Sequence, residues 1–255
     1  MSDVRRPVAG DPVDVALAAV VLECPAAQVI DVGGGSGTRA VPLASLGCRV
    51  TVVDSSADAL AILQSRARDA GVADRVHGVQ ADAERLGTVV RSGHADLVLC
   101  HHLLEAVDDP AAVMAGMAVA LRPGGRASVL VAGRLGAVLG HLLAGRYAEA
   151  RAILTDPDGR FGSSDPLCRR FEPCGIADLL TRVGLQVESV TGLGLLDGLV
   201  TGGVRYSSSG TVGELADLEA LMSEHRTLRD IAPDLHVLAR RPTLSAPPDV
   251  GERVV

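Results

Sequence analysis

The chain has 255 residues, of which 47% are hydrophobic, and it carries a formal net charge of −7 with a pI near 5.5. An acidic chain without a single lysine is a poor match for a long phosphate backbone, so the composition argues against a broad nucleic-acid surface and leaves open only a local arginine patch. The five cysteines lack Cys-x-x-Cys spacing, which argues against a disulfide framework and a zinc site.

In chain order, a helix is predicted at 12–22, followed by a short buried strand and a glycine-rich turn. The strand leads into Asp31, and the turn after it carries three glycines: Gly33, Gly35 and Gly37. Residues 39–46 then have helical spacing. A strand, a tight turn and a helix N-terminus in this order form the usual site for a nucleotide-type cofactor. Glycines allow the backbone and the cofactor to approach closely. Thr38 stands where a dinucleotide fingerprint has Gly or Ala, and no Gly-Lys-Ser/Thr is present, so an NAD site is disfavoured and a P-loop is excluded.

The pattern Asp-x-Gly-x-Gly-x-Gly at 31–37 resembles the first motif of class I S-adenosylmethionine (SAM) methyltransferases. Later segments resemble further elements of that family in the same order: 50–54, 79–83, 95–102 and 121–126. The resemblance implies an α/β, doubly wound, Rossmann-like sheet of seven mostly parallel strands, with the last strand antiparallel beside the fifth. It also implies SAM as the cofactor and S-adenosylhomocysteine (SAH) as the product.

The same resemblance assigns the cofactor-binding residues. Asp54 ends the second predicted strand, where a carboxylate is placed to accept hydrogen bonds from both ribose hydroxyls. Asp82 is expected to accept from the adenine amino group, and the Ala83 amide to donate to a ring nitrogen. The predicted set is Asp31, Gly33, Gly35, Gly37, Asp54, Ser55, Asp82, Ala83, Cys100 and His101. Asp54 and Asp82 could instead be only helix N-caps, and this alternative stays open.

A base is needed only when the acceptor atom carries a proton, and without lysine the candidates are His101, Glu105 and His141. Adjacent residues of a strand face opposite sides, so at most one of His101 and His102 is expected to point at the cofactor. The position at the tip of the fourth strand favours His101 as the catalytic residue, with a structural histidine as the alternative. Glu105 is expected to face solvent on the helix after that strand.

A carboxylate acceptor would need no base at neutral pH, but it would need orientation by a bidentate arginine. Arg169 and Arg170 are predicted for this role, with Arg160 nearby and solvated surface charge as the alternative. These residues fall in an insertion, 134–172, after the fifth strand. Ligands of open α/β folds bind at the carboxyl end of the sheet, so we expect this insertion to be a lid over the acceptor, or otherwise a surface elaboration.

The remaining elements are predicted from hydropathy spacing and turn residues. They are helices at 135–144 and 147–154 in the insertion, a helix at 174–183, a strand at 185–191, a looser segment at 201–213, a helix at 214–229 and a last strand at 235–239. We expect one methyltransferase domain over 1–241 and a flexible tail at 242–255. The first residues lack a hydrophobic signal segment and no apolar stretch is long enough to span a bilayer, so a cytoplasmic protein is expected, without a metal and with its oligomeric state left open.

Three segments, 101–125, 145–150 and 235–242, resemble the bacterial tRNA methyltransferases that esterify 5-carboxymethoxyuridine at the wobble position. The chain departs from them in its short segment before the first strand and in Asp234, which lies in a stretch where the relatives carry an arginine. Few aromatic residues are available to stack an anticodon base. We therefore predict SAM-dependent methyl transfer to a small-molecule or carboxylate/hydroxyl acceptor. The tRNA reaction is the alternative, and a non-catalytic SAM-binding protein is the second alternative.

Overall fold

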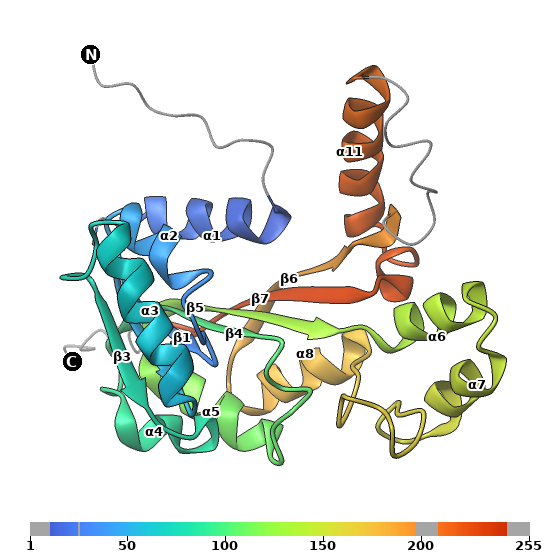
Figure 1. Cartoon of the computed structure of the whole chain (residues 1–255), viewed down its shortest axis with the longest axis horizontal. Coiled ribbons are helices and arrows are strands. Elements are labelled where there is room, and N and C mark those ends of the chain that lie inside the picture. Colours follow the sequence, from blue (N-terminus) through green and yellow to red (C-terminus); the bar gives the residue numbers. More distant parts are fainter. Residues whose placement is uncertain (1–10, 25, 197–208, 244–255) are drawn as a thin grey trace, which may run out of the picture.

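A single mixed sheet forms the centre of the computed structural model, which describes residues 11–24, 26–196 and 209–243, without the side chains of 209–213 and 216. Its strand order is β3-β2-β1-β4-β5-β7-β6 (Figure 1). The strands are β1 (Gln28–Val32), β2 (Arg49–Asp54), β3 (Val76–Gln80), β4 (Ala95–His101), β5 (Leu121–Ala132), β6 (Gln186–Leu193) and β7 (Asp234–Arg240). Strand β7 runs antiparallel to both β5 and β6, and every other pair is parallel. The predicted seven-stranded fold, with its last strand inserted beside the fifth, is confirmed.

Helices cover both faces of this sheet. They are α1 (Pro12–Leu22), α2 (Ala40–Ser45), α3 (Ala57–Asp69), α4 (Leu86–Val89), α5 (Pro110–Ala120), α6 (Arg134–Leu143), α7 (Tyr147–Thr155), α8 (Pro173–Arg182) and α11 (Ser209–Glu224), with short 3₁₀ turns at Ala83–Arg85 and Arg229–Ile231. Helices α1, α2 and α3 share one hydrophobic cluster with the sheet, and α4, α5 and α8 share the other. Because strand residues alternate between faces, Val29 packs in the first cluster and Ile30 in the second.

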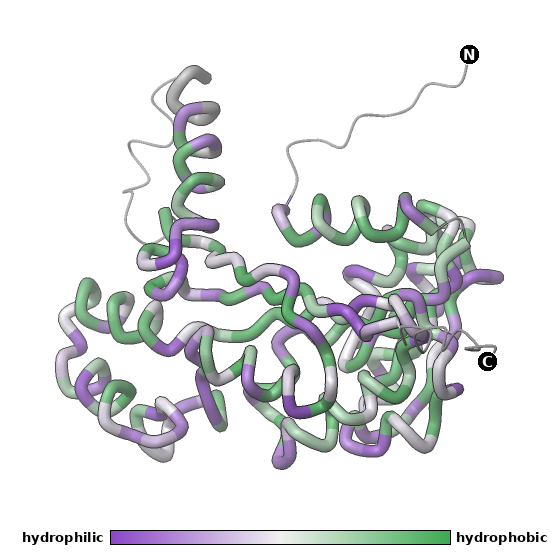
Figure 2. Tube along the Cα trace, turned by 180° about the vertical axis from the view of Figure 1, so that it is seen from behind, coloured by the Kyte–Doolittle hydropathy of each residue, from purple (hydrophilic) through white to green (hydrophobic). Residues whose placement is uncertain are grey.

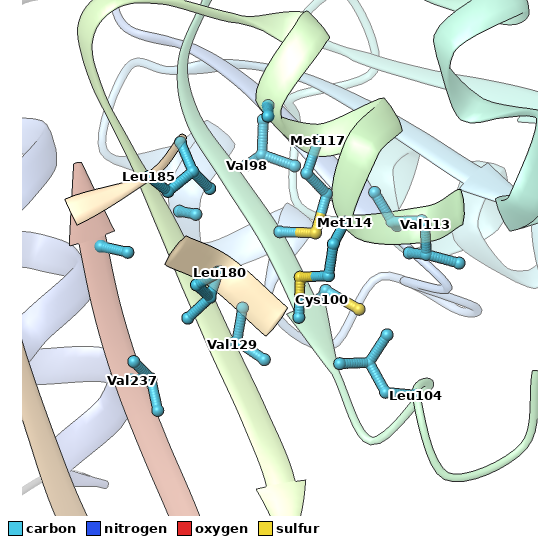
Figure 3. Close-up of a cluster of buried hydrophobic side chains, with 14 of the residues drawn as sticks. Val98, Cys100, Leu104, Val113, Met114, Met117, Val129, Leu180, Leu185 and Val237 are labelled. Carbon is cyan, nitrogen blue, oxygen red and sulfur yellow. The ribbon is translucent and has the colours of Figure 1, made fainter. Parts of the chain in front are cut away.

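The core is built from aliphatic side chains and methionine, because the chain has no tryptophan and only two phenylalanines. Figure 3 shows Met114 and Met117 of α5 packed against Val98 and Cys100 of β4. Full burial of one such side chain contributes about 1.5–3 kcal/mol. Hydrophobic residues run along the central strands, as Figure 2 shows, so the ends of these strands are held rigidly by the core.

Helix α11 differs from its predicted bounds, because it begins at Ser209 and ends at Glu224. The predicted looser segment, 201–213, lies outside the described residues except for its last five, which are helical. Glycine and serine lower helix propensity only by fractions of a kcal/mol to about 1 kcal/mol, so a packed helix tolerates them. Of the predicted tail, only the first two residues belong to the described part of the chain.

The insertion after β5 folds as the two predicted helices, which pack against each other, and then as an extended loop. Arg134 fixes this unit, because its guanidinium donates to the carbonyls of Ile153, Leu154 and Asp156 at the end of α7. At the start of α6, Gly136 lies directly against the carbonyl of Ala232, where a Cβ atom would come within 2.1 Å of the oxygen. The insertion is therefore anchored to the segment that precedes β7.

Candidate functional site

The glycine turn after β1 has the backbone conformation that its sequence predicts. Gly33, Gly35 and Gly37 have φ angles of 70°, 52° and 80°, in the left-handed region that favours glycine. A Cβ atom on Gly37 would lie 2.2 Å from the side chain of Leu63, and the amide of Gly33 donates to the carbonyl of Val53 at 2.7 Å. The turn is thereby held against the carboxyl ends of β1 and β2.

Asp54 at the end of β2 contacts this turn directly. Its Oδ2 accepts from the amide of Gly35 at 2.9 Å, and its Oδ1 accepts from the amide of Ser56 at 2.8 Å. The N-cap of α3 is Ser56, whose hydroxyl accepts from the amide of Ala59. Asp54 is therefore not needed as the helix cap, and each of its oxygens can accept a further hydrogen bond.

A pocket of about 300 Å³ lies beside this carboxylate. Its wall includes Gly33, Asp54, Ser55, Asp82, Ala83 and Leu103. Asp82 also caps the 3₁₀ turn after β3, since its Oδ1 accepts from the amide of Glu84 at 2.9 Å. Asp82 is therefore both a cap and part of the pocket wall. The structure brings together the residues predicted for the ribose and the adenine, and their contacts with a cofactor stay predictions.

A larger pocket of about 870 Å³ begins on the other side of Gly33. Its walls come from the start of α1, the glycine turn, the tips of β4 and β5, the end of β6 and the helix α11. Figure 1 shows α1 and α11 on the same side of the sheet. Glu219 of α11 accepts from the amides of Leu195 and Leu196, both at 2.8 Å, which fixes α11 to the end of β6. No residue of 134–172 lines either of these two pockets, so a lid role for the insertion stays a prediction.

Arg39 joins the glycine turn to α1, a contact that the sequence analysis missed. Its guanidinium pairs with Asp11 at 2.5 Å and also with Asp14, and both Asp11 and Arg39 line the larger pocket. Arg39 follows the glycine motif in the chain, whereas the two aspartates lie at the start of α1. In the sequence, only their opposite charges indicate that these side chains pair. The ion pairs hold the start of α1 at the rim of the pocket.

Asp31 lies in the wall of the larger pocket and is almost completely buried. Its Oδ2 has no hydrogen-bond partner among the described residues, and burial raises the pKa of this carboxyl to about 7. A buried acceptor without a donor is costly, and a ligand that carries N–H groups or positive charge would satisfy it. SAM carries both an ammonium group and a sulfonium, so Asp31 fits the amino-acid end of this cofactor.

His101 ends β4 and joins a buried hydrogen-bonded chain. Its Nε2 lies 2.9 Å from the hydroxyl of Ser128 on β5, and that hydroxyl lies 2.8 Å from Nε2 of His236 on β7. Burial lowers the pKa of His101 to about 3 and that of His236 to about 4, so both imidazoles are neutral at neutral pH. Nδ1 of His101 is buried without a partner among the described residues, and His101 lines the larger pocket.

His102 lines the same pocket, so the expectation that at most one of the two histidines would face the site was wrong. Strand β4 ends at His101, and His102 has a φ of 51°, which interrupts the alternation of side chains. Its amide donates to the carbonyl of Leu130 at 2.8 Å. Its Nδ1 lies 3.3 Å from Oε1 of Glu105, and this hydrogen bond raises the pKa of the imidazole.

Glu105 corrects a second expectation, because it is buried with an exposed fraction of 1% and does not lie on a helix. The connection from β4 to α5 first makes a turn that brings this residue under the end of β5. There its Oε1 accepts from the amide of Ala132 at 2.6 Å. The third candidate base, His141, pairs with Glu149 at 2.6 Å within the insertion and lines neither of these pockets.

The two predicted acceptor-binding arginines lie elsewhere in the structure. Arg169 donates to the carbonyls of Leu104, Val107 and Asp108, which fixes the turn after β4. Arg170 forms a buried ion pair with Asp165 at 2.6 Å. Neither arginine lines the pockets described above, so a role in holding an acceptor stays a prediction that their positions do not favour.

Cys100, also predicted at the cofactor site, points into the core between β4 and α5, where burial raises the pKa of its thiol (Figure 3). It lines neither pocket, so only its backbone is available near the strand tip. Among the residues that the structure describes, no group of three His, Cys, Asp or Glu side chains is arranged to hold a metal ion. In the same part of the chain, no helix combines the length and apolarity needed to cross a membrane.

Residues 30–129 match a family model described as a methyltransferase domain. A ubiquinone biosynthesis O-methyltransferase from Xanthomonas euvesicatoria pv. vesicatoria (strain 85-10) is 30% identical over 185 residues, which cover 72% of each chain. A tRNA 5-carboxymethoxyuridine methyltransferase from Escherichia coli (strain K12) is 26% identical over 215 residues, covering 84% of this chain and 80% of the relative.

A solved SAM-dependent methyltransferase from Mesorhizobium loti has the same fold, with a TM-score of 0.59 at 20% identity over 89% of this chain and 96% of that chain. These similarities agree with the strand order, the glycine turn and the two pockets that meet at Gly33. The chain belongs to the S-adenosylmethionine-dependent methyltransferase family, as the motif from Asp31 to Gly37 predicted.

Proposed function

We propose that this enzyme transfers the methyl group of SAM to a hydroxyl group of a mainly apolar small molecule. The composition of the larger pocket is the observation that carries this proposal. As far as the structure describes the chain, its wall combines acidic and aliphatic side chains with one arginine. When bound, SAM supplies an electrophilic methyl group on its sulfonium, and the protein's task is to hold the acceptor atom close to that carbon and in line with it.

The charge of the pocket disfavours an anionic acceptor. Four acidic side chains of the described part of the chain line it, from Asp11, Asp31, Asp234 and Glu219. Arg39 is the single arginine among the described residues that line it, and its guanidinium is already paired with Asp11 and Asp14 at the start of α1. A carboxylate acceptor about 4 Å from one ionised carboxylate of this wall would be repelled by about 4 kcal/mol at an effective dielectric constant of 20. A neutral hydroxyl group avoids this cost.

The rest of the wall favours an apolar body on the acceptor. The aliphatic lining comes from separate elements, namely Val13 of α1, Leu130 of β5, Leu193 of β6, Leu196 after it and Leu215 of α11. Each square ångström of apolar surface removed from water contributes about 25 cal/mol, so such a wall binds ring or chain carbons. The Xanthomonas relative, named a ubiquinone biosynthesis O-methyltransferase, supports this assignment.

The chain's own residues divide between cofactor and acceptor. Asp54 and Asp82, in the smaller pocket, are suited to the ribose and the adenine. Asp31 and the glycine turn, in the wall of the larger pocket, are suited to the amino-acid end. The space between His101 and α11 then remains for the acceptor.

The tRNA reaction is the second candidate, because the relative that bears that name is similar over a larger part of this chain. Its acceptor group is a carboxylate on an anionic RNA, which the acidic pocket disfavours. A protein that binds SAM without chemistry is the third candidate. Asp31, Asp54 and Asp82 all lie at the pockets, which supports binding but does not separate this candidate from an enzyme.

Transfer of labelled methyl from SAM into a cell extract of the producing organism tests all three. The extract is separated into RNA and small molecules, and Asp54→Asn serves as the control for cofactor binding. Mild alkali hydrolyses a methyl ester but leaves a methyl ether intact, and mass spectrometry of the labelled compound separates an ether from a methylamine. Alkali-stable ether in the small-molecule fraction is the expected result.

A methyl ester or a methylamine as the sole small-molecule product would overturn the proposal, and so would two further outcomes. Label in RNA that mild alkali removes would establish the tRNA reaction instead. An absence of transfer, together with intact SAH binding in calorimetry, would establish a binding protein.

A further inference from the structure

We propose that His102 is the catalytic base that takes the proton of the acceptor hydroxyl, with Glu105 and Asp234 as the carboxylates beside its two ring nitrogens. This inference rests on the proposed function, because only an acceptor atom that carries a proton requires a base. His102 was not among the bases that the sequence suggested. It is identified by its position and by its neighbours.

The backbone places the imidazole of His102 in the wall of the larger pocket. Its φ of 51° is one of two positive values among the described non-glycine residues, and its amide is bound to the carbonyl of Leu130. Such a conformation is uncommon for a residue with a Cβ atom and is retained only where the surroundings fix it. The side chain is 51% exposed, so a proton taken from the acceptor can pass on to water.

The two ring nitrogens have different surroundings. Nδ1 lies 3.3 Å from Oε1 of Glu105, a carboxylate that the amide of Ala132 holds at 2.6 Å. Nε2 lies 4.0 Å from Oδ1 of Asp234, too far for a hydrogen bond. A proton on Nδ1 that is donated to Glu105 leaves the lone pair of Nε2 available on the side of Asp234, which itself lines the pocket.

The step balances with groups that are present. The acceptor's O–H bond breaks, its proton moves to Nε2 of His102, and the oxygen electron pair forms the bond to the methyl carbon while the bond from that carbon to the cofactor's sulfur breaks. The resulting imidazolium is stabilised by Glu105 and Asp234, and it then releases its proton to solvent. A general base of this kind typically contributes a factor of about 10²–10⁴ to the rate.

The charged groups around His102 favour its protonated form on balance. Glu105 comes from its own turn and Asp234 from β7, and both raise the pKa of His102. Arg39, beside the glycine turn, and partial burial lower it. His101, the adjacent residue, has its pKa lowered to about 3 and is too weak a base for this role at neutral pH.

The first test uses His102→Gly, because glycine adopts a positive φ without strain. The acceptor is the small-molecule fraction in which wild-type protein forms alkali-stable label, used at several dilutions. We expect the maximum rate to fall by about 10²–10⁴-fold, SAH affinity in calorimetry to stay within about twofold, and added imidazole to restore part of the rate. His94→Gln, an exposed histidine before β4, is the matched control and should leave the rate unchanged.

The second test uses the pH profile. Removal of a neighbouring carboxylate should shift the acidic limb of the maximum rate to lower pH, because the imidazolium loses a stabilising charge. Asp234→Asn is suited to this test, since its side chain is 39% exposed and tolerates substitution, whereas Glu105→Gln changes a buried position. A side chain with a merely structural role would change the height of the profile and leave the limb in place.

The outcomes separate this inference from the proposed function. Alkali-stable label with wild-type protein and an undiminished rate with His102→Gly would overturn the assignment of the base while leaving O-methylation in place. Loss of activity that imidazole does not restore, with an unshifted acidic limb in Asp234→Asn, would overturn it as well. If wild-type protein forms only a methyl ester, the proposed function fails first.

Discussion

The buried chain of His101, Ser128 and His236 predicts how stability should depend on pH. His236 is 4% exposed, and burial lowers its pKa in the folded state to about 4, against 6.5 for the free side chain. Below pH 6.5 the unfolded chain binds a proton that the folded chain does not bind. Stability is therefore lost as the pH falls from 6.5 towards 4, and the contribution is fully present above 6.5.

The magnitude follows from the two pKa values. One unit of pH corresponds to about 1.36 kcal/mol per proton, so at pH 5 this single histidine costs about 2 kcal/mol relative to pH 7.5. In His236→Gln this cost is absent, whatever the substitution itself does to packing. The stability of the variant minus that of the wild type should therefore rise by about 2 kcal/mol between pH 7.5 and pH 5.

Urea unfolding followed by far-ultraviolet circular dichroism measures this difference, since the chain has no tryptophan for fluorescence. Comparing one difference at two pH values cancels the packing cost and also the contribution of Asp31. His236 also lowers the pKa of His101, so any change that the substitution causes at His101 acts in the same direction as the expected rise. His94→Gln, at an exposed position, should give a difference that does not change with pH. A constant difference for His236→Gln as well would refute the reasoning, because His236 would then titrate normally in the folded protein.

Three further substitutions probe the cofactor site, the buried ion pair of the insertion and the backbone of the glycine turn. Asp54→Asn should weaken SAH binding in calorimetry by about 1.5–3 kcal/mol through the loss of charge-assisted hydrogen bonds, while the exposed Asp58→Asn on α3 should not, and equal affinities would remove the ribose assignment. Asp165→Asn breaks the buried ion pair of the insertion and should destabilise the fold by about 3–5 kcal/mol. Urea unfolding measures this loss, and the rate of the folded enzyme should not change. A loss below about 1 kcal/mol would contradict the burial of this ion pair. Gly37→Ala, at φ 80° and against a side chain of α3, should lower the free energy of unfolding by about 1–3 kcal/mol. Gly140→Ala, in open space on α6, should raise it by about 0.4–1 kcal/mol. Similar effects of the two substitutions would contradict the argument that the turn requires glycine.

The position of the glycine turn and of the two carboxylates near it could be predicted from the sequence because these features are local. The glycine turn needs backbone angles that few residues besides glycine adopt, so the three glycines in the sequence indicate its conformation. Asp54 is the last residue of β2 and Asp82 comes two residues after β3, and parallel strands bring their carboxyl ends to one edge of the sheet. The seven-stranded, mostly parallel sheet and the antiparallel insertion of β7 beside β5 followed from the family resemblance and are confirmed.

The acceptor half depends on contacts that no local pattern encodes. Ser128 and His236 meet only because β7 pairs with β5 in a register that sets Leu130 opposite His236, and a shift of one residue would turn His236 to the other face. Likewise, the sequence shows Arg169 and Arg170 as neighbouring cations but not that carbonyls and Asp165 already occupy them. The prediction of an arginine clamp therefore rested on charge without knowledge of partners.

The two adjacent histidines show how strongly position decides chemistry. His101 is the last residue of β4, enclosed by Ser128 and His236, and its imidazole stays neutral. One residue later the backbone turns to positive φ, and His102 meets a buried carboxylate that raises its pKa. Two groups with the same side chain are thereby driven in opposite directions, the arrangement in which one group orients a substrate through hydrogen bonds while the other exchanges its proton. Because both line one pocket, the end of β4 at His101 is what allows a single site to hold a neutral imidazole and a basic one together.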